Sequence, residues 1–268
     1  MQSETTGEEG LLTPEDPAPF TVFNPDGAAT ILLLCDHASN AVPRRLAGLG
    51  LLERDLNRHI AHDIGAAGIT RFLAKRFDAP AILAGYSRLV IDCNRPLDHP
   101  TSIIPESDAT AIPGNARISD SKRSARATAC FWPYHHEIAR TLAGFDRRGI
   151  VTALIAVHSF TPVLLGSRRP WQIGVLWNED DRIAAPLIAA LRARTEYDIG
   201  DNEPYSGKSH TGFTIAEHAI AEGRPCVMLE IREDLVPDAE SEIRIGTLLG
   251  DCLADILTDK SLYRRWTT

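Results

Sequence analysis

The most prominent pattern in the chain is a set of short apolar runs that end in polar residues. Residues 31–35, ILLLC, are apolar without interruption, and Asp36 and His37 follow them directly. A continuous apolar run of this length is typical of a strand buried on both faces of a parallel sheet. Open α/β sheets bind their ligands at the carboxyl ends of such strands. This stretch therefore predicts a buried strand that ends at a ligand site.

Three later apolar runs carry polar residues in the same way. The carboxyl ends of parallel strands share one edge of a sheet, so we expect these polar side chains to meet there. The runs are VIDCNRP (90–96) with Asn94 and Arg95, TALIAVHS (152–159) with His158 and Ser159, and CVMLEIR (226–232) with Glu230 and Arg232.

Segments with the apolar spacing of helices lie between these runs. Strands that alternate with helices, without internal repeats, predict one α/β domain over residues 19–268 after a mobile segment 1–18. FTVFNPDG is expected to form a short edge strand and a turn. The expected helices cover 53–77, 119–145 with Ser119 as its cap, 180–194, 214–223 and 239–258, and two further strands are expected in 80–96 and 171–178.

Composition narrows the class of protein. The net charge of −8 over 268 residues gives no basic surface for nucleic acid, and 44% hydrophobic residues suffice for a sizeable core. The chain lacks the run of about 20 apolar residues that a membrane span needs. Its opening, MQSETTGEEG, has none of the features of a secretory signal. The sequence contains no CxxC pair, so a thiolate metal site is not expected. We expect a reduced, cytoplasmic protein that binds neither membranes nor nucleic acid.

His37 and His158 are the candidate metal ligands, because each follows or ends a predicted strand. A catalytic zinc site has about three protein ligands and one open position. Asp63 is the first choice for the third ligand, ahead of Asp36 and His62. The structural alternative is that His37 caps a turn and His158 is a core histidine, and the spacing alone does not decide between these readings.

Glu230 follows four apolar residues, and a buried carboxylate is costly unless it is paired or functional. Burial raises its pKa, which suits a general base; the alternative is a salt bridge to Arg232. The Asn94–Arg95 pair can grip a substrate carboxylate, and Arg88 can polarise a carbonyl, although either arginine can also form an ordinary ion pair.

The remaining histidines and serines carry weaker signals. His135, His136 and Glu137 are ambiguous on their predicted helix, whereas His99, His210 and His218 are expected at the surface. Ser39 and Ser159 lack a GxSxG context, so a serine nucleophile is not expected. Two loops are candidates for closing over a ligand: residues 96–118, and residues 202–212, which include His210.

Several motifs together resemble the N-formylglutamate amidohydrolase family. They are CDHASNAVP, HDIGA, YSRLVIDCNRP, PYHHEI, HSFTP and LEIRxDL, and they occur in the family's order from about residue 30 to 255. The resemblance implies the three-layer α/β/α fold of zinc carboxypeptidases and aspartoacylases, with a mixed, mostly parallel sheet. It also implies metal-dependent hydrolysis of a small N-acyl amino acid, with zinc or cobalt as cofactor and N-formyl-L-glutamate as the type substrate.

The resemblance also implies roles for individual residues. By position, His37 and His158 resemble the metal-binding histidines, Glu230 the general acid/base and Arg88 the carbonyl-polarising arginine. Asn94 and Arg95 resemble the pair that holds the substrate carboxylate, and His135 of PYHHEI is a further substrate-binding candidate.

The chain departs from the wider pattern at two places. The His-x-x-Glu motif has Asn40 at its fourth position, and CDHAS replaces an IPHSG-like start. Either Asp63 supplies the missing carboxylate or the metal is held weakly. Two rival functions remain open: a deacylase or carboxypeptidase-like hydrolase with another substrate, and a metal-free protein that binds small carboxylates.

Overall fold

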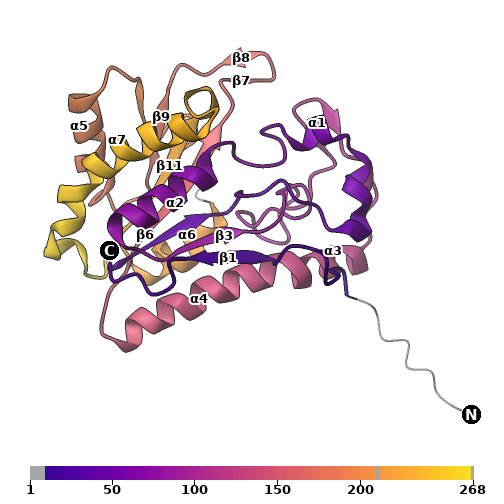
Figure 1. The fold of residues 1–268 in the computed structure, drawn as a ribbon, viewed down its shortest axis with the longest axis horizontal. Helices are drawn as coiled ribbons and strands as arrows, with labels where there is room; N and C mark the ends of the chain where they lie inside the picture. Colours follow the sequence, from indigo (N-terminus) through magenta and orange to yellow (C-terminus); the bar gives the residue numbers. More distant parts are fainter. Residues whose placement is uncertain (1–9, 209–211, 267–268) are drawn as a thin grey trace, which may run out of the picture.

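The architecture is a mixed sheet covered by helices on both faces (Figure 1). The computed structural model describes residues 10–208 and 212–266. The seven-stranded sheet has the order β1-β3-β2-β6-β11-β9-β10, and only the β1–β3 and β11–β9 pairs are antiparallel. Its strands are β1 (Phe20–Phe23), β2 (Ile31–Cys35), β3 (Ala81–Ala84), β6 (Ala153–Phe160), β9 (Ile173–Leu176), β10 (Ile199–Asp201) and β11 (Cys226–Arg232).

The helices form two layers because alternate residues of each strand face opposite sides of the sheet. Leu33 of β2 packs in the core beneath α2, α5 and α7, whereas Leu34 packs on the other side, against α4 and α6. In Figure 1, α4 runs along one side of the sheet, and α2 and α7 lie on the other. The helices are α1 (Glu53–Leu56), α2 (Ala66–Phe77), α3 (Asp120–Arg126), α4 (Trp132–Arg147), α5 (Ala184–Arg194), α6 (Phe213–His218) and α7 (Ala239–Thr258).

The predicted fold class is therefore confirmed, together with the strands at 31–35, 152–159 and 226–232. The strand predicted at 90–96 is wrong. This segment turns repeatedly; for example, the Val90 amide donates to the Ser87 carbonyl (2.9 Å). Its apolar side chains, such as Ile91, are buried in a separate core cluster outside the sheet. Burial there produced an apolar run without a strand.

The helical segment predicted over residues 53–77 is interrupted. Two helices, α1 and α2, are separated by turns, and Gly65 precedes α2 with a φ of 77°, a left-handed conformation that favours glycine. Asp63 consequently lies in a turn, where its amide donates to the His37 carbonyl (3.0 Å). This break carries Asp63 to the end of β2.

The helix predicted over 119–145 begins as expected, with the Ser119 hydroxyl accepting a hydrogen bond from the Lys122 amide. A π-helical turn at Ala127–Phe131 joins α3 to α4 without a break, and Pro133, which has no N–H to donate, is the second residue of α4. Proline thus marks a change of helix type rather than a break.

Two short hairpins lie outside the main sheet: β4 (Glu106–Ser107) with β5 (Thr110–Ala111), and β7 (Val163–Leu164) with β8 (Ser167–Arg168). Of the segment predicted to be mobile, residues 1–9 lie outside the described part of the chain. Residues 10–18 contact the domain, where the Arg44 amide donates to the Asp16 carboxylate (2.9 Å). Among the described residues, no helix combines the length and apolar character needed to cross a membrane.

Candidate active site

Three buried side chains converge at the carboxyl edge of the sheet. His37 follows β2, Asp63 precedes α2 and His158 lies in β6, and one ligand atom from each lies within 4.8 Å of the others. The Nδ1 atoms of His37 and His158 lie 3.2 Å and 2.8 Å from the same Asp63 oxygen, Oδ2. The sequence placed the two histidines at strand ends, and the fold brings the carboxylate between them.

A second carboxylate holds each imidazole from behind. The Nε2 atom of His37 lies 2.7 Å from Asp92, and the Nε2 atom of His158 lies 3.2 Å from Asp36. Burial opposes protonation of both rings, but the surrounding carboxylates outweigh it and raise the pKa of each histidine. Burial likewise opposes ionisation of Asp63, yet the two histidines lower its pKa well below the usual value.

This donor set fits a divalent metal such as zinc. Two imidazoles and one carboxylate form a common catalytic zinc site. Metal-binding histidines usually donate their second N–H to a carboxylate, which fixes the tautomer, and Asp92 occupies that position behind His37. Asp36 lies in the corresponding place behind His158 as an ion-pair partner, without the geometry of a hydrogen bond. The Asn40 side chain instead donates to Asn57 (2.8 Å) near the surface. Asp63, rather than Asn40, therefore supplies the carboxylate of this cluster.

The other two candidates for the third ligand have different surroundings. Asp36 lies behind His158 and accepts hydrogen bonds from Tyr134 (2.8 Å) and Thr214 (2.7 Å). His62 is half-buried and does not belong to the cluster. Asp36 thus lies behind His158 and outside the three-residue cluster.

Glu230 lies beside this cluster on the neighbouring strand, because β11 and β6 pair Glu230 with His158. It is 6% exposed, and its Oε2 atom has no hydrogen-bond partner among the described residues. Burial chiefly raises the pKa of Glu230 to about 7, and the charge of Asp63 adds to this effect. A carboxyl with this pKa can both accept and return a proton near neutral pH.

Arg88 bridges the cluster and the carboxylate behind it. Its guanidinium lies 3.3 Å from Asp63 and 3.2 Å from Asp92. Burial opposes its charge, but these two carboxylates raise the pKa of Arg88, so the side chain stays protonated. Arg232, the alternative partner of Glu230, binds Asp234 instead (2.8 Å).

A cavity of about 120 Å³ opens between these side chains. Leu176, Tyr205, Gly212 and Met228 also line it, and the sequence analysis did not identify them as site residues. Tyr205 and Gly212 belong to the loop 202–212 that was expected to close over a ligand. Seven of the eight predicted site residues line the cavity: His37, Asp63, Arg88, Asn94, Arg95, His158 and Glu230.

His135, the eighth, does not line the cavity. It is 4% exposed, its Nε2–H donates to the Cys93 carbonyl (2.9 Å), and its Nδ1 accepts from Nε2 of His218 (3.0 Å). The expectation that His218 is a surface residue is wrong, because it is 9% exposed where α6 packs against α4. His210 lies outside the described residues.

Asp92 is the main supporting residue that sequence reasoning overlooked. It lies in the run VIDCNRP, two positions before Asn94, and its carboxylate accepts from the Asn94 amide (2.8 Å) as well as from His37. An acidic residue in the middle of an apolar run was the available signal, since burial of a carboxylate requires a partner.

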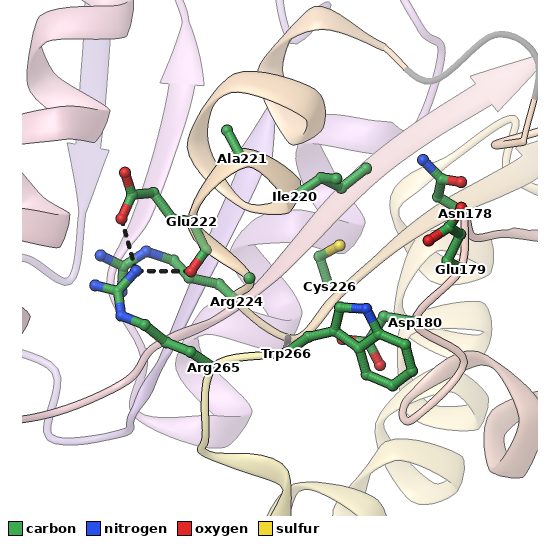
Figure 2. Close-up of a pocket in the computed structure, with 11 residues that line it drawn as sticks. Asn178, Glu179, Asp180, Ile220, Ala221, Glu222, Arg224, Cys226, Arg265 and Trp266 are labelled. Atoms are coloured by element: carbon green, nitrogen blue, oxygen red, sulfur yellow. Dashed lines mark hydrogen bonds and ion pairs between the residues drawn. The ribbon is translucent and has the colours of Figure 1, made fainter. Parts of the chain in front are cut away.

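A larger cavity of about 480 Å³ lies elsewhere, at the start of β11 (Figure 2). Residues 178–180, the turn after α6 and the C-terminal Trp266 surround it, and Arg265 binds Glu222 at one end. Burial raises the pKa of its Cys226 thiol to about 12, so the thiol stays protonated. None of the predicted site residues lines this cavity, and size alone does not make it the active site.

A family model described as N-formylglutamate amidohydrolase matches residues 29–236. The chain belongs to the N-formylglutamate amidohydrolase family. Its members hydrolyse amide bonds, so the predicted class of enzyme, a hydrolase of linear amides, is confirmed.

Two solved structures resemble this one. A gene product from Agrobacterium tumefaciens has a TM-score of 0.90 and 31% identity, over 94% of this chain and 99% of that chain. An N-formylglutamate amidohydrolase from Ralstonia eutropha JMP134 has a TM-score of 0.62 and 21% identity, over 90% and 97%, and this likeness shows the fold alone. No protein with a curated description is detectably similar in sequence.

Proposed function

We propose that the protein is a metal-dependent amidohydrolase that cleaves the amide bond of a small N-acyl amino acid. The observation that carries this proposal is the buried His37–Asp63–His158 cluster beside Glu230. Zinc is the first candidate metal and cobalt the second, because both accept two imidazoles and a carboxylate. N-formyl-L-glutamate, which would yield formate and L-glutamate, is the substrate that names the family. The donor set also favours kinship with zinc carboxypeptidases and aspartoacylases.

The metal would be held by His37, Asp63 and His158, and when bound it supplies the Lewis acidity that activates water and polarises a carbonyl. Glu230 takes a proton from the attacking water as the new carbon–oxygen bond forms. It then gives this proton to the amide nitrogen as the carbon–nitrogen bond breaks, so that a carboxylic acid and an amine leave. A pKa near 7 suits both transfers.

Three further side chains would bind and polarise the substrate. Arg88 lines the cavity with its guanidinium held by Asp63 and Asp92, which favours a role in stabilising the negative charge that develops on the carbonyl oxygen. Asn94 and Arg95 lie together in the cavity wall and are proposed to hold the substrate carboxylate. We propose no substrate contact for His135, since protein atoms occupy both of its ring nitrogens.

The proposal is tested with protein purified without chelator, analysed for metal and assayed with a panel of N-acyl amino acids. We expect about one divalent ion per chain and hydrolysis of at least one substrate. Asp63→Ala should lose the metal. Glu230→Gln should keep the metal and lose at least about 100-fold in kcat, whereas Glu179→Gln, an exposed acid in the larger cavity, should retain both.

Two results would count against the proposal. A protein that binds N-acyl amino acids but hydrolyses none, with metal present, would be a carboxylate-binding protein instead. Full activity of Glu230→Gln would remove Glu230 from the mechanism.

A further inference from the structure

The two arginines that line the small cavity differ in their ion pairs. Arg88 is held by two buried carboxylates, Asp63 and Asp92. Among residues 10–208 and 212–266, Arg95 donates only to the neighbouring Asn94 carbonyl (3.3 Å) and forms no ion pair. Among the described residues of the cavity wall, Arg95 is thus the one side-chain cation without a carboxylate partner. As far as the described residues show, the cavity therefore offers one cationic site for a substrate carboxylate.

An apolar surface lies within reach of the reacting amide. Met228 precedes Glu230 by two residues on β11, so both side chains face the same side of the sheet, about 7 Å apart. Leu176 is the antiparallel partner of Met228 across β9, and both belong to the same core cluster. They are 3% and 5% exposed, and both line the cavity. Leu176 and Met228 together form what we call the apolar wall.

The distance from Glu230 to the apolar wall suits an amino-acid side chain. In an N-acyl amino acid, the α-carbon is one bond from the amide nitrogen and bears both the carboxylate and the side chain. With the amide at Glu230 and the carboxylate at Arg95, the side chain has the apolar wall as a neighbouring surface. A charged side chain there would lose its hydration without gaining a partner, which is costly. An apolar one would gain from burial.

We infer that the preferred substrate is an N-acyl amino acid with an uncharged, apolar side chain seated against Leu176 and Met228, rather than N-formyl-L-glutamate. This inference rests on the proposed function and narrows its substrate class. The small volume of about 120 Å³ further requires a short acyl group such as formyl or acetyl, since pockets for drug-sized ligands are about 300–1,000 Å³.

Arg169 is the alternative recognition group for a second carboxylate. Its guanidinium donates to the Tyr205 hydroxyl (2.9 Å) and lies 4.9 Å from the centre of that ring. Tyr205 lines the cavity but Arg169 does not. Because Tyr205 lies between Arg169 and the cavity, Arg169 would have to leave its contact with Tyr205 to reach a substrate. We therefore favour the apolar side chain and include Arg169 in the test.

The experiment compares kcat/KM for N-formyl-L-methionine and N-formyl-L-glutamate, whose side chains are of similar length but differ in charge. N-formyl-L-glutamine separates the effect of charge from that of polarity. We expect N-formyl-L-methionine to exceed N-formyl-L-glutamate at least tenfold, with N-formyl-L-glutamine between them. Calorimetric binding of the same compounds to metal-loaded Glu230→Gln protein should give the same order and shows that the preference arises in binding.

Variants of the apolar wall test its role directly. Met228→Lys should raise the activity toward N-formyl-L-glutamate relative to N-formyl-L-methionine at least tenfold, whereas Met228→Gln, the uncharged control, should not. If Met228→Lys does not fold, the wild-type comparison alone decides.

The outcomes separate this inference from the proposed function. A glutamate preference, or a methionine preference below tenfold, overturns the inference while the proposed function stands. A glutamate preference that disappears in Arg169→Gln would assign the second carboxylate to Arg169. Absence of hydrolysis with all three compounds and with acetyl analogues, in metal-loaded protein, overturns the proposed function itself.

Discussion

The buried pair His135 and His218 should make the protein sensitive to acid. The rings stack with centroids 5.2 Å apart, and the hydrogen bond between them requires His135 to be neutral, because its Nδ1 atom is the acceptor. Burial chiefly lowers the pKa of His135 to about 4, and the neighbouring His218 adds to this effect. Burial also lowers the pKa of His218 to about 4. In the unfolded chain, both rings return to ordinary values near 6.5.

The sign of the effect follows from proton binding. Between pH 6.5 and about 4, the unfolded chain binds more protons at these rings than the folded protein, so folding stability falls as the pH falls. The stability that the two neutral rings contribute is fully present above about pH 6.5. For one ring, lowering the pKa from 6.5 to about 4 corresponds to about 3 kcal/mol in the free energy of unfolding. This is a large fraction of the about 5–15 kcal/mol that stabilises a typical domain.

The assay compares wild type with His218→Gln, because the glutamine amide can donate to His135 but does not titrate. Urea unfolding of metal-free protein at about pH 7 and about pH 4.5 should show wild type losing about 2–3 kcal/mol more than the variant. His99→Gln, at an exposed histidine, is the control and should behave as wild type. Equal losses in wild type and His218→Gln would refute the reasoning.

Three further perturbations test the site. Arg95→Ala should raise KM about 10- to 100-fold with little change in kcat, because a charge-assisted contact to the substrate carboxylate is lost; an unchanged KM in steady-state kinetics would contradict this role. Gly212→Ala should lower the free energy of unfolding in urea by about 1–3 kcal/mol, because its Cβ would collide with the Asn94 side chain. Asp36→Asn should weaken zinc binding about 10- to 100-fold in chelator competition, because Asp36 orients His158; wild-type affinity would show that the orientation does not depend on it.

Local patterns were sufficient for much of the fold. The uninterrupted apolar runs 31–35 and 226–232 form buried strands, because strands covered on both faces have no polar side. The helix 239–258 also has the predicted bounds, and it begins with a capping box formed by Asp238 and Ser241. Such features depend on neighbours within one or two turns and can therefore be read locally.

Local patterns failed where burial comes from distant parts of the chain. Val90 and Ile91 are buried in a core cluster outside the sheet, so this run imitates a strand. His218 resembles a surface residue in sequence, yet α4 covers it. In both cases, a sequence pattern does not reveal which distant segment of the chain buries the side chain.

For the candidate site, the sequence by itself determined which chemical groups stand at the strand ends: an imidazole after β2, another in β6 and a carboxylate in β11. Only the tertiary structure decided that Asp63 joins the two imidazoles and that Asp36 and Asp92 lie behind them. It also decided that Arg95 is the one arginine of the described cavity wall without a carboxylate partner. The reason is physical. Strand and helix periodicity depends on adjacent residues, whereas these contacts join residues 26 to 122 positions apart, whose separation is set by sheet order and packing.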